Sequence, residues 1–431
     1  MGAYVITGGK PLAGTISISG NKNAALPCLA ATLLTDERIV LRNIPAIEDV
    51  KIMLELLKSL GSSVEYLDAN TVAVTSSLSN CRNTNEIPHH LVDAIRASIL
   101  LSGPLVARRK KVLLPPPGGD VIGLRRLDTH FAGLEALGCT CKITSSGMLE
   151  ITEKKLQGTR IFLEEASVTA TENLVMAASL SSGTTVLVNA ACEPHVQDVC
   201  TMLVAMGANI SGIGSNVLTI VGTDSLSGCD FTIGSDYMEV GSFIGLAAAT
   251  KGEILLENVN LEHVSVLKRG FQKVGIECVE TGSSSLFVPA LQARRVKKAL
   301  DGGTIKLDDA PWPGFPADLL SIITVVATQM HGTVLIHEKM YETRMFFIDW
   351  LVRMGADIIL CDPHRAVVNG PSRLKNAVVT SPDVRAGMAL VIAALCSQGV
   401  STIQNIYQIE RGYEQLAKKL LGVGASIERI E

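Results

Sequence analysis

Apolar and polar residues follow a pattern that recurs six times along this chain. In each repeat a leucine-rich segment of helical periodicity ends at a glycine, and alternating or mostly apolar residues follow. The glycines, 68 to 80 residues apart, are Gly61, Gly138, Gly207, Gly275, Gly355 and Gly424. A helix that ends in left-handed geometry favours glycine after its last turn, and alternation is typical of strands. Each repeat is therefore predicted to contain a helix, a glycine and a strand.

A second helix and strand are predicted upstream of each of these helices. Residues 173–190, 239–259 and 385–406 are examples, and their helical parts consist almost entirely of Ala, Leu, Ile, Val, Ser and Gly. A helix that is apolar on all sides is a buried helix. The leucine-rich helices carry charge on one face, so we expect them on the outside. Each unit of about 70 residues thus reads helix, strand, helix, strand, strand.

Six such units could form one solenoid or two globules of three units each. A solenoid needs polar capping repeats, and the sixth unit ends at residue 431 directly after its strand. Two globules also fit the usual domain size better. We predict an α/β protein with one domain at 21–234 and the other formed by 1–20 plus 235–431. The N-terminal strands are expected to join the second domain.

The composition of the chain excludes several classes of function. The net charge is −4, so no broad basic field is available for binding nucleic acid. Met388–Cys396, nine residues long, is the longest uninterrupted apolar run and is too short to span a bilayer. The ten cysteines are scattered without a C-x-x-C pair, and no H-E-x-x-H motif occurs, so no disulfide framework or metal site is expected. A reducing cytoplasm is the natural location.

One polar or charged residue stands at the equivalent position in each predicted inner helix, close to its start. The six are Lys22, Arg96, Thr171, Glu239, Asp318 and Arg385. Free N–H groups at a helix start attract anions, whereas the helix dipole disfavours cations there. Three cations at such positions favour anion binding, although each alone could be a solvated cap.

The loop at residues 113–130 departs most from the repeat. Three prolines and three glycines surround Asp120, and Arg125, Arg126, Asp128 and His130 follow. A long glycine-rich loop inside a regular repeat is often a functional lid, and the alternative is an ordinary exposed connection. Elsewhere, the rigid sequence Trp312–Pro316 is expected to hold Asp318 in place.

Five segments resemble the enolpyruvyl transferases. They are GTISISGNKNAALPCLAATLL, DAIRASILLSGPLVAR, LPPPGGDVIGLRRLDTHFAGLEALG, PGFPADL and IERGYEQL, and the resemblance runs from about residue 5 to 431. It implies a two-domain inside-out α/β barrel with six βαβαββ-type units and an active site in the cleft between the domains.

The branch that the segments resemble most closely acts on a nucleotide sugar. The implied reaction moves the enolpyruvyl group of phosphoenolpyruvate to the 3-hydroxyl of UDP-N-acetylglucosamine and releases phosphate, by addition and then elimination. This is the first committed step of peptidoglycan precursor synthesis, and it needs no cofactor. Oligomeric state is left open.

The resemblance also implies roles for individual residues. The catalytic residues are Asp120, Asp318, Lys22 and Arg411. Phosphoenolpyruvate would be bound by Lys22, Asn23, Arg125, Arg344, Arg385 and Arg411. The UDP-sugar would be bound by Asn23, Arg96, Arg125, Arg126, Leu127, Asp128, Thr129, Asp318 and Met340. Asp318 would take the proton of the sugar hydroxyl, and Asp120 would protonate the methylene carbon.

Three positions depart from the family's pattern. Glu165 replaces a lysine near the diphosphate, Arg126 replaces a loop proline, and Asp120 stands where many members have the cysteine that fosfomycin alkylates. The alternatives are a sister enolpyruvyl transferase acting on shikimate 3-phosphate or another nucleotide, and a silent paralogue that only binds a nucleotide sugar or a regulatory partner. Retention of Lys22, Asp120, Asp318 and Arg411 argues against the silent paralogue.

Overall fold

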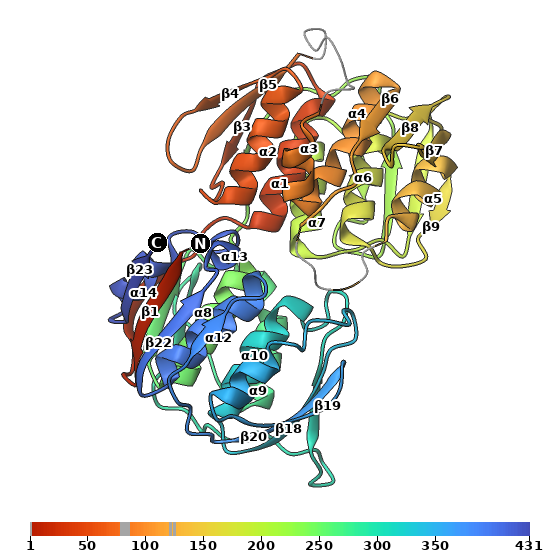
Figure 1. Cartoon of the computed structure of the whole chain (residues 1–431). Coiled ribbons are helices and arrows are strands. Elements are labelled where there is room, and N and C mark those ends of the chain that lie inside the picture. The colour runs from red at the N-terminus through yellow and green to blue at the C-terminus, as the bar shows by residue number, and fades with distance from the viewer. Residues whose placement is uncertain (1, 78–86, 120–122, 124–125) are drawn as a thin grey trace. The chain divides into compact units, whose positions relative to one another are not determined.

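The six predicted repeats are present in the computed structural model, which describes residues 2–77, 87–119, 123 and 126–431. The chain divides into two compact units. The first unit contains residues 20–77, 87–119 and 126–234, and the second contains residues 2–19, 123 and 235–431. Each unit carries three repeats (Figure 1).

The first unit has the following elements. Its helices are α1 (Lys22–Ala31), α2 (Glu48–Ser59), α3 (His89–Ala94), α4 (Ser102–Arg109), α5 (Asp128–Ala136), α6 (Val168–Ser179) and α7 (Pro194–Ala205), with 3-10 turns at Thr32–Leu34 and Arg96–Leu101. Its strands are β3 (Ile39–Arg42), β4 (Ser62–Tyr66), β5 (Val72–Ser76), β6 (Lys111–Leu114), β7 (Cys139–Ile143), β8 (Leu149–Glu153), β9 (Arg160–Phe162), β10 (Thr184–Val188), β11 (Asn209–Ser211), β12 (Val217–Val221) and β13 (Asp230–Thr232).

The second unit is built in the same way. Its helices are α8 (Tyr237–Thr250), α9 (Val264–Lys273), α10 (Leu320–Thr328), α11 (Ile348–Arg353), α12 (Val384–Cys396), α13 (Tyr407–Glu410) and α14 (Leu416–Gly422), with 3-10 turns at Leu261–His263 and Ala317–Leu319. Its strands are β1 (Ala3–Gly8), β2 (Ala13–Ser17), β14 (Glu253–Glu257), β15 (Val279–Glu280), β16 (Ser285–Val288), β17 (Ile305–Asp308), β18 (Gly332–His337), β19 (Asp357–Asp362), β20 (Arg365–Gly370), β21 (Val378–Thr380), β22 (Gly399–Gln404) and β23 (Ser426–Ile430).

Each repeat contributes one small sheet. The described residues form five four-stranded sheets, ordered β13-β3-β5-β4, β11-β12-β10-β9, β15-β16-β14-β2, β17-β18-β20-β19 and β21-β22-β1-β23, and one three-stranded sheet, β6-β8-β7. In every four-stranded sheet the strand after the inner helix pairs with one parallel neighbour, as β14 does with β2, and one antiparallel neighbour, as β14 does with β16. β1 lies between β22 and β23, which places the N-terminal strands in the second unit.

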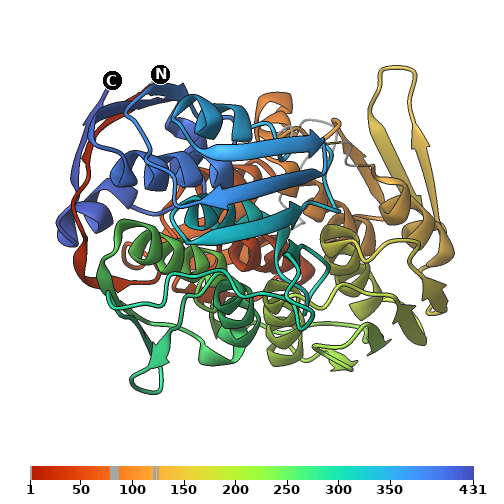
Figure 2. The same cartoon turned by 90° about the horizontal axis from the view of Figure 1, so that it is seen from below.

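The helices that were predicted to be apolar on all sides are buried. All fourteen residues of α8 are buried, as are all nine of α10. These two helices contact each other and α12 in the middle of the second unit. In Figure 2 the sheet β17-β18-β20-β19, drawn in cyan to blue, lies in front of the helices of its unit. The sheets therefore cover a helical core, and the predicted inside-out architecture is confirmed.

The six glycines have the backbone geometry that their positions predicted. Each has a positive φ, between 83° at Gly275 and 102° at Gly207. The outer helices bury one face only, as α9 does with Val264, Leu267 and Phe271. Left-handed glycine after each outer helix thus turns the chain into the hairpin of the next sheet.

The inner helix of the second repeat differs from the prediction. A continuous helix was expected from Arg96, but Arg96 begins a 3-10 turn and α4 starts only at Ser102. Ile95 is extended, with φ −133° and ψ 135°, and separates this turn from α3. Asp318 likewise lies in a 3-10 turn that precedes α10. Within the described ranges, no helix has the length and apolar character that crossing a membrane requires.

The polar residue near the start of α8, Glu239, is paired inside the second unit. Its carboxylate accepts hydrogen bonds from the Ser19 backbone N–H (2.7 Å) and from Lys419 Nζ on α14 (2.6 Å). Lys419 also donates to Ser19 Oγ at 2.7 Å. Burial raises the pKa of Glu239, and Lys419 opposes that rise. This pair joins three distant segments of the chain.

We therefore predict that Lys419→Ala lowers the free energy of unfolding by about 3–5 kcal/mol, because it leaves a buried carboxylate without its cation. Chemical denaturation, in which the unfolding transition of the second unit is followed, measures the lost free energy. Lys418→Ala, which removes an exposed neighbour on the same helix, is the control and should change stability by less than about 0.5 kcal/mol. Equal effects of the two substitutions would contradict the structural role of Lys419.

Candidate active site

Asp318 is held at the start of α10 by a rigid turn. Gly314 N–H donates to the Pro311 carbonyl (2.8 Å), and Ala310 N–H donates to the Phe315 carbonyl (3.1 Å). The Phe315 ring packs edge-on against Phe271 of α9, with centroids 6.4 Å apart. This packing fixes the 3-10 turn Ala317–Leu319, as the sequence predicted for the Trp312–Pro316 segment.

Two arginines from other repeats converge on the Asp318 carboxylate. Arg344 Nη2 lies 2.5 Å from Oδ1, and Arg385 Nε lies 3.2 Å from Oδ2. Burial disfavours the charged form of Asp318, but the attraction of Arg344 and Arg385 and their hydrogen bonds outweigh it. The pKa of Asp318 consequently lies well below its ordinary value, and the carboxylate is ionised at neutral pH.

Arg385 is the second residue of α12 and is almost completely buried. Its guanidinium carbon lies 4.9 Å from the centre of the Tyr413 ring, in cation–π geometry. The Tyr413 hydroxyl is hydrogen-bonded to Ser242 Oγ of α8 at 2.7 Å. Burial lowers the pKa of Arg385, but Tyr413, Asp236 and Asp318 outweigh this effect and raise the pKa above its ordinary value. The arginine is therefore charged, with the Tyr413 ring on one face and the Asp318 carboxylate at its edge.

At α8 and α12, backbone N–H groups that were expected to be free at the helix start are already hydrogen-bonded to capping aspartates. Asp383 caps α12 and accepts hydrogen bonds from the backbone N–H groups of Arg385 (2.8 Å) and Ala386 (2.9 Å). Asp236 caps α8 by accepting from Met238 and Glu239. The protein's own carboxylates use these donors, so the cationic side chains, rather than the helix ends, remain for an anionic ligand.

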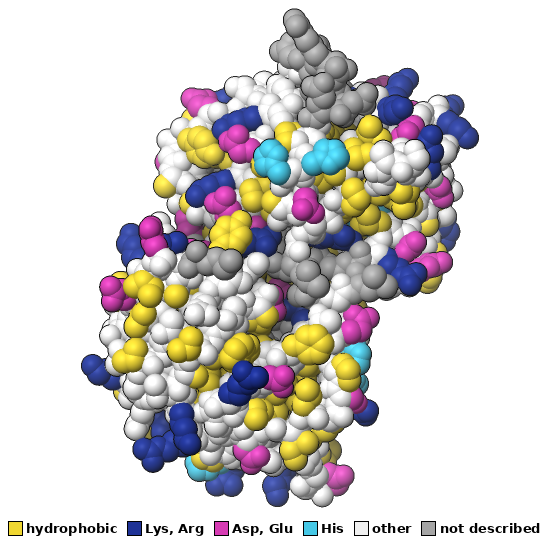
Figure 3. Space-filling view, viewed as in Figure 1, with side chains coloured by type: hydrophobic (Ala, Val, Ile, Leu, Met, Phe, Trp, Pro, Cys, Tyr) yellow, Lys and Arg dark blue, Asp and Glu magenta, His cyan; other side chains and the backbone are white. Residues whose placement is uncertain are grey.

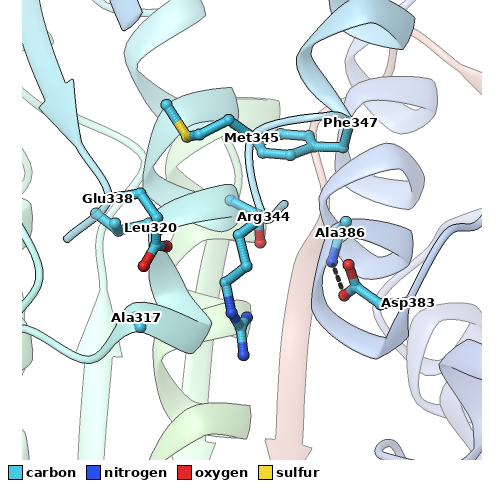
Figure 4. Close-up of a pocket in the computed structure, with 9 residues that line it drawn as sticks. Ala317, Leu320, Glu338, Arg344, Met345, Phe347, Asp383 and Ala386 are labelled. Atoms are coloured by element: carbon cyan, nitrogen blue, oxygen red, sulfur yellow. Dashed lines mark hydrogen bonds between the residues drawn. The ribbon is translucent and has the colours of Figure 1, made fainter. Parts of the chain in front are cut away.

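Arg344 lies at the end of a tightly bonded loop that follows β18. Its guanidinium carbon is 4.9 Å from the centre of the Tyr341 ring. Figure 4 shows the arginine between Glu338 and Asp383 in a pocket whose remaining wall includes Ala317, Leu320 and Phe347. Met340, predicted near the uridine, is in the same loop and is 38% exposed.

Arg411 directly follows α13 and is 5% exposed. Its Nη1 donates to Gln408 Oε1 at 3.1 Å. Like Arg385, it is a buried cation of the second unit.

The first unit contains the other predicted residues. Lys22 opens α1, and its ammonium lies 2.6 Å from Asp49 Oδ2 at the start of α2. Both side chains are largely buried, with 13% and 5% of their surface exposed. Asn23 follows Lys22, and its backbone N–H donates to the Asn21 side chain at 2.8 Å. Lys22 is therefore a buried cation with a fixed counter-charge.

Several residues predicted to bind the UDP-sugar lie in the second repeat, at Arg96 and around the start of α5. Arg96 Nη1 donates to the Pro117 carbonyl at 3.4 Å. Arg126 and Asp128 are exposed, and Leu127 is half-buried. Thr129 Oγ1 donates to Glu165 Oε1 at 3.3 Å. The departure at Glu165 thus directly touches a residue of this group.

Asp120 and Arg125 lie outside the described residues. Of the remaining candidates, the structure brings Asp318, Arg344 and Arg385 together in one cluster. Sequence reasoning missed Asp49, Asp236, Asp383 and Tyr413, which fix the cations. The only sequence signal of the three aspartates is an acid beside a helix start, which is also common in helices without function. Across the described parts of the chain, no three His, Cys, Asp or Glu side chains are grouped as a metal site would need.

Comparison with known proteins assigns the chain to a family. A profile of the family described as "EPSP synthase (3-phosphoshikimate 1-carboxyvinyltransferase)" matches residues 6–420. The chain belongs to this family of carboxyvinyltransferases.

Relatives within this family match along the whole chain. A "UDP-N-acetylglucosamine 1-carboxyvinyltransferase" of Treponema denticola is 55% identical over 428 residues, covering 99% of both chains. One of the same description from Treponema pallidum is 53% identical, with the same coverage. The crystal structure of the enolpyruvyl transferase NikO from Streptomyces tendae has a TM-score of 0.87 at 22% identity, and covers 100% of this chain and 99% of that one. This last likeness concerns the fold.

The arginine pair around Asp318 predicts a distinct response to acid. In Asp318→Asn, two buried cations lose their shared counter-charge, so the free energy of unfolding at pH 7 should fall by about 1.5–3 kcal/mol. Because the native pKa of Asp318 is depressed, its contribution is present above about pH 4 and is lost as the pH falls below that value. The stability gap between the two proteins should therefore narrow in acid.

Denaturant titrations at a series of pH values from 7 to 2.5 measure this gap. The exposed Asp357→Asn is the matched control and should show no such change. A gap that stays constant down to pH 2.5 would mean that the two arginines do not stabilise the ionised form of Asp318.

Proposed function

We propose that this protein transfers the enolpyruvyl group of phosphoenolpyruvate to the 3-hydroxyl of UDP-N-acetylglucosamine, with release of phosphate. The observation that carries the proposal is the 53–55% identity, along 99% of both chains, to relatives described by that activity. The cluster of Asp318, Arg344 and Arg385 supports it, because the reaction needs a base beside cations that bind a substrate with a phosphate and a carboxylate.

Asp318 is the proposed base for the sugar hydroxyl. A carboxylate whose pKa is far below neutrality is a weak base, so the two arginines that hold it must be partly withdrawn before it accepts a proton. Phosphoenolpyruvate supplies anionic oxygens that compete for Arg344 and Arg385. When these oxygens take up the guanidinium groups, burial is left to raise the pKa of Asp318. Substrate binding thereby activates the base.

The remaining cations are proposed to bind phosphoenolpyruvate. Lys22, Arg125 and Arg411 would meet its phosphate and carboxylate, and Asn23 would contact both substrates. Asp49 holds the Lys22 ammonium in place before the anion arrives. Residues of both units would act on the same substrates, with Asp120 as the acid that protonates the methylene carbon.

The nucleotide sugar is proposed to contact Arg96 and the segment Arg126–Thr129 in the first unit, and Met340 in the second. An acceptor other than UDP-N-acetylglucosamine is the second candidate, because Glu165 adds a negative charge at Thr129 where a diphosphate is expected. The exposed Arg126 is the nearest cation in sequence that could offset this charge.

The reaction would place the protein at the entry to peptidoglycan precursor synthesis, and so in cell-wall growth and division. We propose a cytoplasmic location, which the nine described free cysteines support. On the face drawn in Figure 3, lysine and arginine are interspersed with aspartate and glutamate, which supports small-molecule substrates rather than nucleic acid.

Phosphate release from phosphoenolpyruvate tests the proposal directly. The purified protein is incubated with UDP-N-acetylglucosamine, shikimate 3-phosphate or UMP, and phosphate and the enolpyruvyl product are measured. We expect release only with UDP-N-acetylglucosamine. Release with another acceptor would establish a sister transferase, and binding of UDP-N-acetylglucosamine without release would establish a silent paralogue.

Asp120 gives a second prediction about the same reaction. Fosfomycin inactivates family members that carry a cysteine at this position by alkylating the thiol, and a carboxylate is a much weaker nucleophile. We expect the native protein to resist fosfomycin, Asp120→Cys to remain active and become sensitive, and Asp120→Asn to lose at least about 100-fold in turnover because its amide cannot donate the required proton.

Residual activity after timed exposure to fosfomycin measures this difference. Rapid, irreversible inactivation of the native protein would contradict the assignment, as would full activity in Asp120→Asn.

A further inference from the structure

Two buried acids, Asp309 and Glu338, lie side by side in the second unit, close to Arg344. Asp309 follows β17 directly, and Glu338 follows β18 directly. These strands are parallel neighbours, with Asp308 opposite His337, and the Asp309 backbone N–H donates to the His337 carbonyl at 3.4 Å. The strand register therefore forces the two acids together, and both are fully buried.

The two carboxyl groups hold the start of the loop that carries Arg344. Three consecutive backbone N–H groups point at them. Lys339 donates to Asp309 at 2.6 Å, Met340 donates to Asp309 at 3.3 Å and to Glu338 at 3.1 Å, and Tyr341 donates to Glu338 at 3.1 Å. Every carboxyl–backbone contact in this set fixes residues between β18 and Arg344.

Two ionised carboxylates would repel each other strongly in this buried setting. A hydrogen bond between the Glu338 and Asp309 side chains requires a proton on one of them. Among the described residues, no N–H or O–H group donates to Glu338 Oε2. Burial, the hydrogen bond to Asp309 and the charge of Asp309 raise the pKa of Glu338 to about 9, against an opposing effect of Arg344.

We propose that Glu338 and Asp309 form a proton-sharing carboxyl pair that positions Arg344 for the transfer reaction. Glu338 is the neutral member at neutral pH. The inference rests on the proposed function for its effect on catalysis, but the proton itself can be tested without any substrate. Neither acid is proposed to touch a substrate, so both are positioning residues.

The charged groups around Glu338 come from several elements. Asp309 faces it from the end of β17, and Arg344 and Tyr341 come from its own loop. Asp383 lines the same pocket from the start of α12 (Figure 4). The ring of His364, before β20, bonds to the Glu338 carbonyl through Nδ1 at 2.8 Å. The pocket residues from the start of α10 are Ala317, Leu320 and Ser321, which carry no charge.

Glu338→Gln keeps the shape of the side chain but removes its ability to lose a proton. The amide oxygen can accept from Met340 and Tyr341, and the amide N–H can donate to Asp309, as a protonated glutamate would. The native protein keeps Glu338 protonated above the pKa of the unfolded chain, so its stability falls relative to the glutamine variant as the pH rises from about 4 to about 9.

Thermal unfolding from pH 5 to pH 9 is the first test. We expect the melting temperature of Glu338→Gln to rise relative to the native protein across this range. Asp309→Asn removes the other carboxylate of the pair and should show the same trend. Because two variants are compared, the test does not fail if one of them folds poorly. Asp308→Asn, the adjacent residue paired with Lys306 and Lys339, is the control and should show no trend. A flat difference for both pair variants would overturn the shared proton.

Enzyme kinetics is the second test. Glu338→Ala should raise the KM for phosphoenolpyruvate at least fivefold, because the loop that carries Arg344 is no longer held, whereas Glu338→Gln should stay within about twofold of native. An unchanged KM in Glu338→Ala would refute the positioning role. If the native chain transfers no enolpyruvyl group, the proposed function fails, and the melting series still decides whether the proton is shared.

Discussion

The ionised Asp318 between Arg344 and Arg385 is the interaction on which the chemistry of the second unit depends. The three residues come from different segments, namely the turn before α10, the loop after β18 and the start of α12. A carboxylate between two guanidinium groups is stable when buried, whereas either arginine alone would be a costly unpaired charge. In the proposed reaction, the same arrangement would offer two cations to an anionic substrate. Binding of that substrate and activation of the base would then be coupled through one set of charges.

The repeat explains why such a cluster forms. In the second unit, each strand that follows an inner helix pairs with a parallel neighbour. Three repeats therefore bring three helix starts, and the loops after parallel strands, into related positions. Aspartates cap two of these helices, which leaves side chains such as Arg385 to meet a ligand. The position that holds Arg385 in one repeat holds Glu239 in another, where it makes a buried structural pair with Lys419. The same place in the fold is thus proposed to bind substrate in one repeat and makes a buried ion pair in another.

Much of the architecture could be predicted from the sequence because its signals are local. Glycine after each outer helix and the absence of charge in each inner helix are properties of short segments. The inner helix of the second repeat was harder to predict, since nothing in the sequence near Ile95 indicates that the backbone becomes extended. Among site residues, the cations stood out because charge is rare in apolar helices. Asp49, Asp309 and Glu338 did not, because an acid at a helix start or strand end looks solvated until the tertiary structure shows that it is buried.

The central claim is that Asp318 is held ionised by two arginines and becomes a base when an anionic substrate takes them up. A carbon-13 NMR titration of aspartate side chains, with Asp318 assigned by the signal missing from Asp318→Asn, tests it most directly. The account predicts that the Asp318 carboxyl of the free protein remains ionised well below the ordinary aspartate range near pH 4, and that phosphoenolpyruvate moves its titration to higher pH. An ordinary titration near pH 4 in the free protein, unchanged by phosphoenolpyruvate, would contradict it.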